Sequence, residues 1–197
     1  MTLAHGNSQS THSLLGKGRS AVRPAGARCG RPAGPCSAAV ETARQSLGGR
    51  VLIHPDACRG MRDLDSAPQS AAWGKAIVRG LTALGAYAVS AEAGFAGGFF
   101  QWCKTSGHPQ SWPATPKKLA MRESETVMNS PKLYRSRILP VATEVDASGA
   151  ILMQAHLKIA EGGGDLAPRI YFTVDPRTTA VHVGFVGPHK HMRNTRS

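Results

Sequence analysis

Alternation of apolar and polar residues in the last third of the chain is the feature that most limits how it can fold. It runs through Ile151–Ile159, Arg169–Val174 and Ala180–Val186. Strand side chains point alternately to the two faces of a sheet, so this period of two predicts three strands, each with one apolar face. Short turns between consecutive strands favour antiparallel neighbours. Arg135–Val141 is also strand-like, so the sequence predicts an antiparallel β meander of three to four strands.

An apolar stripe in the middle of the chain indicates one long helix. Trp73, Ile77, Leu81, Leu84 and Ala88 recur at spacings of three or four residues, as on one face of an α-helix. The stripe begins after Ser66-Ala67-Pro68, a typical helix start, and we expect the helix to end near Gly94. This helix can cover the apolar face of the meander, which makes the predicted fold class α+β.

Composition divides the chain of 197 residues into three parts. Residues 1–37 are rich in Gly, Pro and Arg and show no apolar periodicity, so we expect a disordered basic extension. Residues 38–134 are expected to be mainly helical. Residues 135–197 are expected to form the meander with a basic tail, packed with 38–134 as one domain.

The sequence also bears on location and cofactors. It contains no run of about 18 to 20 apolar residues, so no membrane span is expected, and no apolar segment typical of a secretory signal. Four cysteines without CxxC spacing predict a cytoplasmic protein with reduced thiols. The histidines at 182, 189 and 191 have no carboxylate or thiolate in the same segment, so we predict no metal and no cofactor.

The polar face of the predicted meander is the candidate site. The two-residue alternation places His156, Lys158, Arg169, Tyr171 and His182 on it. The chain then continues through His189, Lys190, His191 and Arg193. Cations and imidazoles on one face can bind phosphates, and they can also move protons and stabilise charge during phosphodiester cleavage. A polar, solvated sheet face is the alternative.

Specific roles follow from this interpretation. As catalytic residues we predict His156, Lys158, Arg169 and His189. Tyr171, His182, Lys190, His191 and Arg193 are predicted to contact nucleic acid. Glu123 and Glu125 precede the meander and are general-base candidates, but we expect both to be solvated surface carboxylates.

Two resemblances add to these expectations. The stretch Arg169–Asp175, a short turn and Val181–His189 resemble the last two strands of RelE-type messenger-RNA interferases. That resemblance implies a ribonuclease, with Arg169 at the family's strand arginine and His189 or Lys190 at its terminal basic position. Residues 119–195 resemble a C-terminal region of uncharacterised actinobacterial and plasmid-borne proteins, through segments such as Pro168–Phe172 and Val183–His189. The second resemblance implies no particular activity.

The functional expectation is interaction with RNA or DNA. Lys and Arg number 24 against 12 Asp and Glu, a net charge of +12, which is common among nucleic-acid-binding proteins. One hypothesis is a small, metal-independent RelE-like endoribonuclease. The alternatives are a non-catalytic nucleic-acid-binding or plasmid accessory module and a protein-interaction domain, with an acidic protein as a further partner.

Overall fold

Both sequence patterns form regular structure in the computed structural model, which describes residues 34–192. The protein is of the α+β class, with a five-stranded mixed sheet and a separate two-stranded sheet. The α-helices are α1 (Pro35–Ser46), α2 (Met61–Ser66), α3 (Ser70–Glu92), α4 (Phe99–Thr105), α5 (Glu125–Met128) and α6 (Pro131–Arg135). The strands are β1 (Val51–Ile53), β2 (Leu119–Ala120), β3 (Ile138–Pro140), β4 (Ala150–Leu152), β5 (His156–Lys158), β6 (Pro168–Val174) and β7 (Val181–Pro188). The 3₁₀ helices are η1 (Pro55–Ala57), η2 (Gly164–Leu166) and η3 (His189–Met192).

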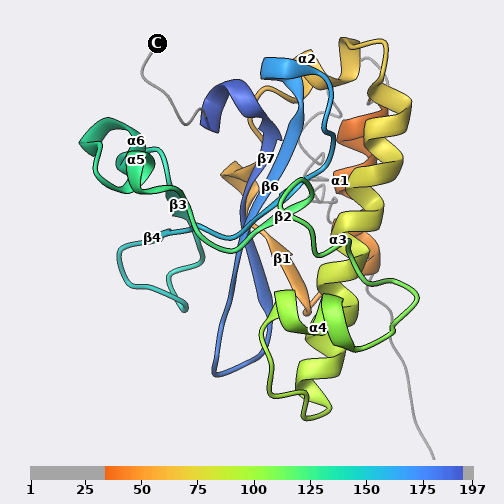
Figure 1. Ribbon diagram of the computed structural model, residues 1–197, viewed down its shortest axis with the longest axis vertical. Coiled ribbons are helices and arrows are strands. Elements are labelled where there is room, and N and C mark those ends of the chain that lie inside the picture. The colour runs from red at the N-terminus through yellow and green to blue at the C-terminus, as the bar shows by residue number, and fades with distance from the viewer. Residues whose placement is uncertain (1–33, 193–197) are drawn as a thin grey trace, which may run out of the picture. The chain divides into compact units, whose positions relative to one another are not determined.

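The large sheet has the strand order β1-β7-β6-β5-β2 (Figure 1). Strands β5, β6 and β7 are consecutive antiparallel neighbours, as a meander requires. The expectation of a simple meander under one long helix is nevertheless wrong, because β1 joins in parallel beside β7 and β2 joins beside β5. Both added strands come from the part of the chain that was expected to be mainly helical. They are only two or three residues long, too short to show an alternation.

Helices α1 and α3 lie together on one side of the large sheet (Figure 1). The predicted stripe on α3 is buried there, from Trp73 to Ala88, against apolar residues of β1, β6 and β7. Gly74 allows α1 to approach closely, since a Cβ at this position would lie 2.6 Å from the carbonyl oxygen of Pro35. The helical layer therefore contains two main helices rather than one.

The start of α1 corrects the expectation that residues up to 37 are disordered. Residues 1–33 lie outside the described range, but Pro35, Cys36 and Ser37 are helical, and Cys36 is fully buried. The Asp65 carboxylate accepts hydrogen bonds from the backbone N–H groups of Cys36 and Ser37, at 2.8 and 3.1 Å. A residue far along the chain thus caps this helix, which no local pattern around residue 35 could indicate.

The predicted strand Ile151–Ile159 is divided between the two sheets. Its first part forms β4, which pairs with β3, and its second part forms β5, which pairs with β2 and β6. Strand β3 is also shorter than expected, because α6 occupies Pro131–Arg135. The period of two continues across the break between β4 and β5, so alternation alone did not reveal it.

Simple alternation in Ala180–Val186 predicts Phe185 on the same face as Val181 and Val183, but a bulge in β7 moves it to the opposite face. Tyr171 pairs with Phe185 and the next residue, Phe172, pairs with Val183, so Gly184 is the extra residue. Such an insertion shifts every later side chain to the other face. Val183 and Val186 consequently face the helices, whereas Phe185 faces away from them.

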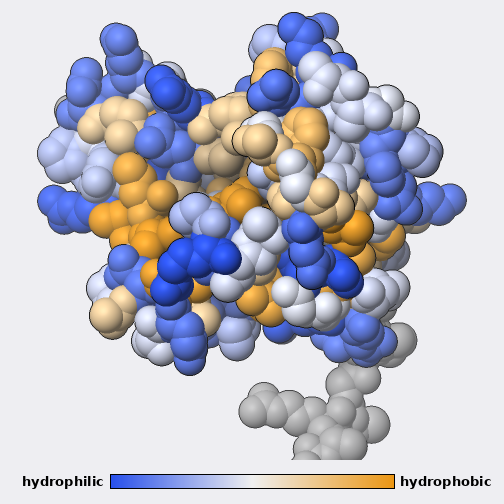
Figure 2. Space-filling view, turned by 90° about the horizontal axis from the view of Figure 1, so that it is seen from below, coloured by the Kyte–Doolittle hydropathy of each residue, from blue (hydrophilic) through white to orange (hydrophobic). Residues whose placement is uncertain are grey.

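A second hydrophobic cluster covers the face of the sheet that points away from α1 and α3. It consists of Leu139, Val141, Met153, Tyr171, Phe185 and Met192. The sheet of β3 and β4 lies on this side, and α5 and α6 lie on the same side in Figure 1. Seen from below, hydrophobic residues are exposed at the surface between hydrophilic ones (Figure 2). No helix within residues 34–192 is long and apolar enough to cross a membrane.

Candidate functional site

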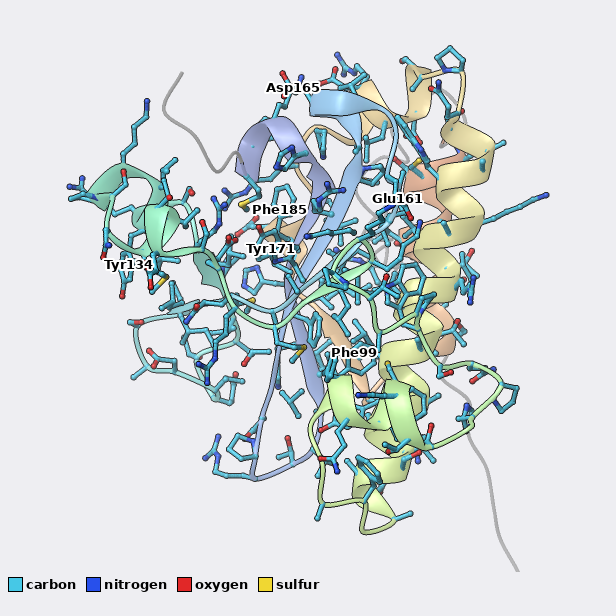
Figure 3. All side chains as sticks on the ribbon, viewed as in Figure 1. Phe99, Tyr134, Glu161, Asp165, Tyr171 and Phe185 are labelled. Carbon is cyan, nitrogen blue, oxygen red and sulfur yellow. The ribbon has the colours of Figure 1, made fainter. Side chains whose placement is uncertain are left out.

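Strand register brings four predicted site residues together. His156 pairs with Tyr171 and Lys158 pairs with Arg169 across β5 and β6. Residues two apart on a strand point to the same face, so all four lie on the face that points away from α3. Figure 3 shows Tyr171 beside Phe185 in the middle of this face, and their rings meet edge to face with centroids 6.0 Å apart.

Two of the four are closed off from solvent. His156 is 5% exposed and Tyr171 1% exposed, and their rings stack with centroids 4.4 Å apart. The β3–β4 side of the molecule and the buried Met192 of η3 cover them. The centre of the predicted polar face is therefore an interior rather than an open, solvated surface.

A carboxylate lies at the centre of this interior, where none was expected. Glu123, in the loop after β2, has a side chain that is 2% exposed. Its Oε1 accepts a hydrogen bond from Arg137 Nε at 2.6 Å and another from the Tyr171 hydroxyl at 2.7 Å. The expectation of a solvated Glu123 is thus wrong, whereas Glu125 is exposed as expected. We call Glu123, Arg137, His156 and Tyr171 the buried polar network.

Arg137 connects this network to η3, at the end of the described residues. Its side chain is fully buried, and it donates to the hydroxyl of Ser136 at 2.7 Å and to the carbonyl of Met192 at 3.1 Å. The guanidinium carbon also lies 5.6 Å from the centre of the Tyr171 ring. Sequence reasoning missed Arg137 because it lies in the stretch Arg135–Val141, which was interpreted as a further strand, and its separation from Glu123 follows no helix or strand period.

Burial sets the protonation of the network. It lowers the pKa of His156 to about 4, although the Gln154 carbonyl and the charge of Glu123 act in the opposite direction. Nδ1 of the neutral ring lies 2.9 Å from the Gln154 carbonyl, so the proton is on Nδ1 and is donated there. Burial also raises the pKa of Tyr171. Both groups are therefore neutral near pH 7 and have their hydrogen bonds inside the protein.

Among the described residues, three basic side chains border the network and are only partly buried: Lys158, Arg169 and His189. We call them the cationic rim. Lys158 Nζ donates to the carbonyl of Pro116 at 2.8 Å, and Arg169 donates to the carbonyls of Pro168 and Ala160 at 3.0 and 3.3 Å. Burial lowers the pKa of Lys158, and the adjacent charge of Arg169 lowers it further. Neither residue forms an ion pair within residues 34–192.

His189 reaches the rim because η3 folds back over the end of the sheet. Its backbone N–H donates to the carbonyl of Ala167 at 3.0 Å. Burial lowers the pKa of the His189 ring, and the positive charge of Arg169 lowers it further. The next two residues turn elsewhere. Lys190 pairs with Asp63 of α2, and His191 lies against Gly60 just before that helix.

His182 lies apart from the rim. It pairs with Thr173 of β6 and with Leu52 of β1, and it is 5% exposed. Its Nε2 is buried and has no hydrogen-bond partner among the residues that the structure describes. Burial lowers the pKa of this ring, so His182 is a neutral group beside β1. Arg193 lies outside the described residues.

Within the described range, no group of three or more His, Cys, Asp or Glu residues is placed to hold a metal ion. The site thus combines a buried interior, in which the charges of Glu123 and Arg137 balance, with a partly exposed cationic rim. Such an arrangement can bind an anion at the rim while the buried network holds β5, β6 and η3 in place.

Comparison with protein-family models, curated proteins and solved structures found no match to this chain. The resemblance of the last two strands to RelE-type interferases therefore stays a prediction.

Proposed function

We propose that this protein binds RNA or DNA through phosphate contacts at the cationic rim. The observation that carries the proposal is the direct cross-strand pair of Lys158 and Arg169 without a carboxylate partner in the described chain. Like charges placed directly opposite each other on a sheet are destabilising. A phosphate between them would offset this repulsion and accept charge-assisted hydrogen bonds from both.

The distribution of charge elsewhere supports a polyanionic ligand. Seven Lys and Arg residues and no acidic residue lie outside positions 34–192. These residues would add sequence-independent attraction to a nucleic-acid backbone, as basic segments generally do. The cytoplasmic location indicated by the cysteine pattern would give the protein access to cellular RNA.

Within this proposal, cleavage of RNA is a second activity that the rim residues would support. His189 is a partly exposed imidazole influenced by the charge of Arg169, so it would move a proton while Arg169 and Lys158 stabilise phosphate charge. His156 and Tyr171 are closed off from solvent and would position β5 and β6 instead of exchanging protons with RNA. The alternative is binding without cleavage.

The test measures binding of a fluorescein-labelled single-stranded RNA by anisotropy, with Lys158→Ala and Arg169→Ala as the variants. Lys75→Ala, on the exposed face of α3, is the matched control for loss of one cation. Each rim variant should weaken binding and lower the slope of log affinity against log salt by about 0.7, the value for one phosphate contact on a single strand. The control should leave that slope unchanged.

The same RNA is then followed on a denaturing gel. Cleavage by the wild type that His189→Ala abolishes, with binding retained, would support the ribonuclease. Binding without cleavage would support the non-catalytic module. The proposal fails if affinity does not depend on salt, or if Lys75→Ala weakens binding as much as the rim variants do.

A further inference from the structure

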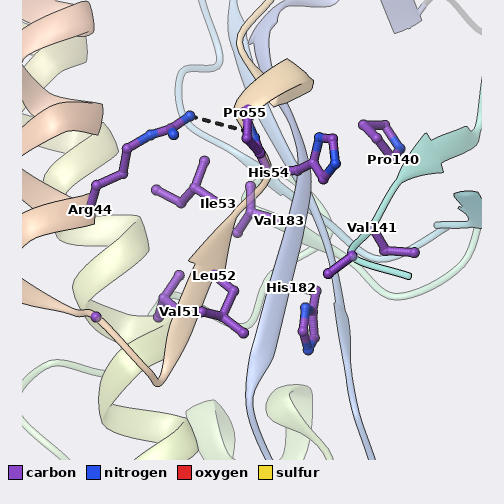
Figure 4. Close-up of a pocket in the computed structure, with 12 residues that line it drawn as sticks. Arg44, Val51, Leu52, Ile53, His54, Pro55, Pro140, Val141, His182 and Val183 are labelled. Carbon is purple, nitrogen blue, oxygen red and sulfur yellow. Dashed lines mark hydrogen bonds between the residues drawn. The ribbon is translucent and has the colours of Figure 1, made fainter. Parts of the chain in front are cut away.

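A cleft of about 340 Å³ runs along the free edge of the large sheet. All five residues of Val51–Pro55, which form β1 and the start of η1, line it. Within residues 34–192, strand β1 has a neighbour, β7, on one side only, so its other side is an edge of the described sheet. We call this the edge cleft (Figure 4).

The hydrogen bonds of β1 show which backbone groups face this cleft. The Arg50 carbonyl accepts from the N–H of Val181, and the His54 N–H donates to the carbonyl of Val183. Successive residues of a strand direct their backbone groups to opposite sides, so Val51 and Ile53 direct theirs away from β7. The N–H of Val51 donates to the carbonyl of Leu47. Among the described residues, the N–H and the carbonyl of Ile53 have no strand partner on the cleft side, and an added strand could pair with both. The Val51 carbonyl points the same way, but Val51 is only 2% exposed.

The two walls of the edge cleft differ in chemistry. On the α1 side it is lined by Arg44 and Gly48, and on the other side by Pro140, Val141 and His182. Figure 4 shows Arg44 on one side of β1, with Pro140, Val141 and His182 on the other. Leu52, on the β3 side, is 42% exposed although it is a large apolar residue. In a strand added to this edge, successive side chains would point alternately to the two walls. Every second side chain would face the Arg44 guanidinium, and the side chains between them would face the wall that contains Pro140 and Val141.

Arg44 supplies the polar recognition. Its NH2 group donates to the carbonyl of His54 at 3.2 Å and lies 3.8 Å from the sulfur of Cys58. No carboxylate pairs with it among the residues that the structure describes. A guanidinium has five N–H donors, so most of this group is available to a carboxylate that enters the cleft.

We propose that the edge cleft binds an extended segment of a partner protein in which acidic and apolar residues alternate. The segment adds a strand beside β1 and pairs with the N–H and the carbonyl of Ile53. Its carboxylates face Arg44, and its apolar side chains pack on Leu52 and Val141. This site is separate from the cationic rim, so the inference does not rest on the proposed nucleic-acid binding.

The test uses the full chain and a short labelled peptide in which glutamate alternates with valine. A second peptide carries lysine in place of glutamate. Arg44→Glu should weaken binding of the glutamate peptide at least about tenfold, the effect of losing one charge-assisted contact. The matched control, Arg62→Glu on the exposed side of α2, changes net charge equally and should stay within about twofold of the wild type.

Amide hydrogen exchange in the wild type provides a readout that needs no variant. The Ile53 amide should exchange rapidly in the free protein and become protected when the glutamate peptide is bound. The Leu52 amide bonds to β7 in both states and should not change. If Arg44→Glu does not fold, as judged by circular dichroism, Arg44→Gln replaces it with the same expected direction.

Three results would overturn the proposal. One is equal weakening by Arg44→Glu and Arg62→Glu, which would mean general charge attraction. Another is unchanged exchange at Ile53 with peptide bound. The third is Ile53 protection that rises with protein concentration, without peptide, together with a dimer in sedimentation, because the occupant would then be a second copy of this chain.

Discussion

Replacing Glu123 by Gln should destabilise the protein strongly, because it removes a charge from the centre of the buried polar network. Arg137, fully buried, and the Tyr171 hydroxyl both donate to the same oxygen of Glu123. Removing one partner of a buried ion pair typically costs 3–5 kcal/mol, since the other charge stays in a medium of low polarity. An amide oxygen can still accept one hydrogen bond, so we expect the lower end, about 3 kcal/mol.

The assay is urea unfolding at neutral pH, with the exposed Glu125→Gln as the control. A double variant, Glu123→Leu with Arg137→Met, removes both charges and should cost less than Glu123→Gln alone, because no buried charge has then lost its partner. The reasoning is refuted if Glu123→Gln lies within about 0.5 kcal/mol of the wild type. It is also refuted if the double variant is the less stable of the two.

Three further predictions concern other parts of the fold. His156 has a folded pKa of about 4 against 6.5 for the free group, so the unfolded chain takes up a proton first and stability falls as pH drops through that interval. His156→Gln should remove that part of the slope, at most roughly 3 kcal/mol, in melts from pH 7 to 4. Gly184→Ala should lower the free energy of unfolding by about 1–3 kcal/mol in urea, since the added Cβ would lie 2.8 Å from Leu139 Cβ and from Met153. The control Gly162→Ala adds a Cβ with no atom within 4 Å and should leave the stability unchanged. Asp65→Ala should cost about 1 kcal/mol by thermal melting through loss of the α1 cap, and an equal loss in the exposed Asp56→Ala would contradict this.

The sequence was informative where a periodic pattern ran long enough to bury one face. The stripe from Trp73 to Ala88 correctly predicted α3, and the alternation in 169–174 predicted β6 with Ile170 and Phe172 towards the helices. Strands of two or three residues, such as β1 and β2, contain only one to one and a half repeats of the two-residue period, too little to show an alternation. The bulge at Gly184 was hidden as well, since a glycine in an alternating run fits either face.

The candidate site shows the same limit. Alternation placed His156, Lys158, Arg169 and Tyr171 on one face, because that inference needs only the period of each strand. It gave no information about what covers the face. Glu123 and Arg137 reach the interior from loops and short elements, and their contact depends on tertiary packing that leaves no local signal in the sequence. The sequence therefore predicted a solvated basic face, whereas Glu123 and Arg137 make the centre of that face a buried interior.

The pairing of β1 with β7 has a consequence for how the protein is made. Val51 pairs with Val181, so a strand near the start of the described residues has its sheet partner near their end. During synthesis α1, β1 and α3 leave the ribosome long before β7 exists, and they must remain without their sheet until β7 has been made. Pairings between distant parts of a chain form slowly, because a large loop has to close first. The helical half of this protein is therefore a candidate client for chaperones that bind nascent chains, and truncation before β7 should leave it unable to fold.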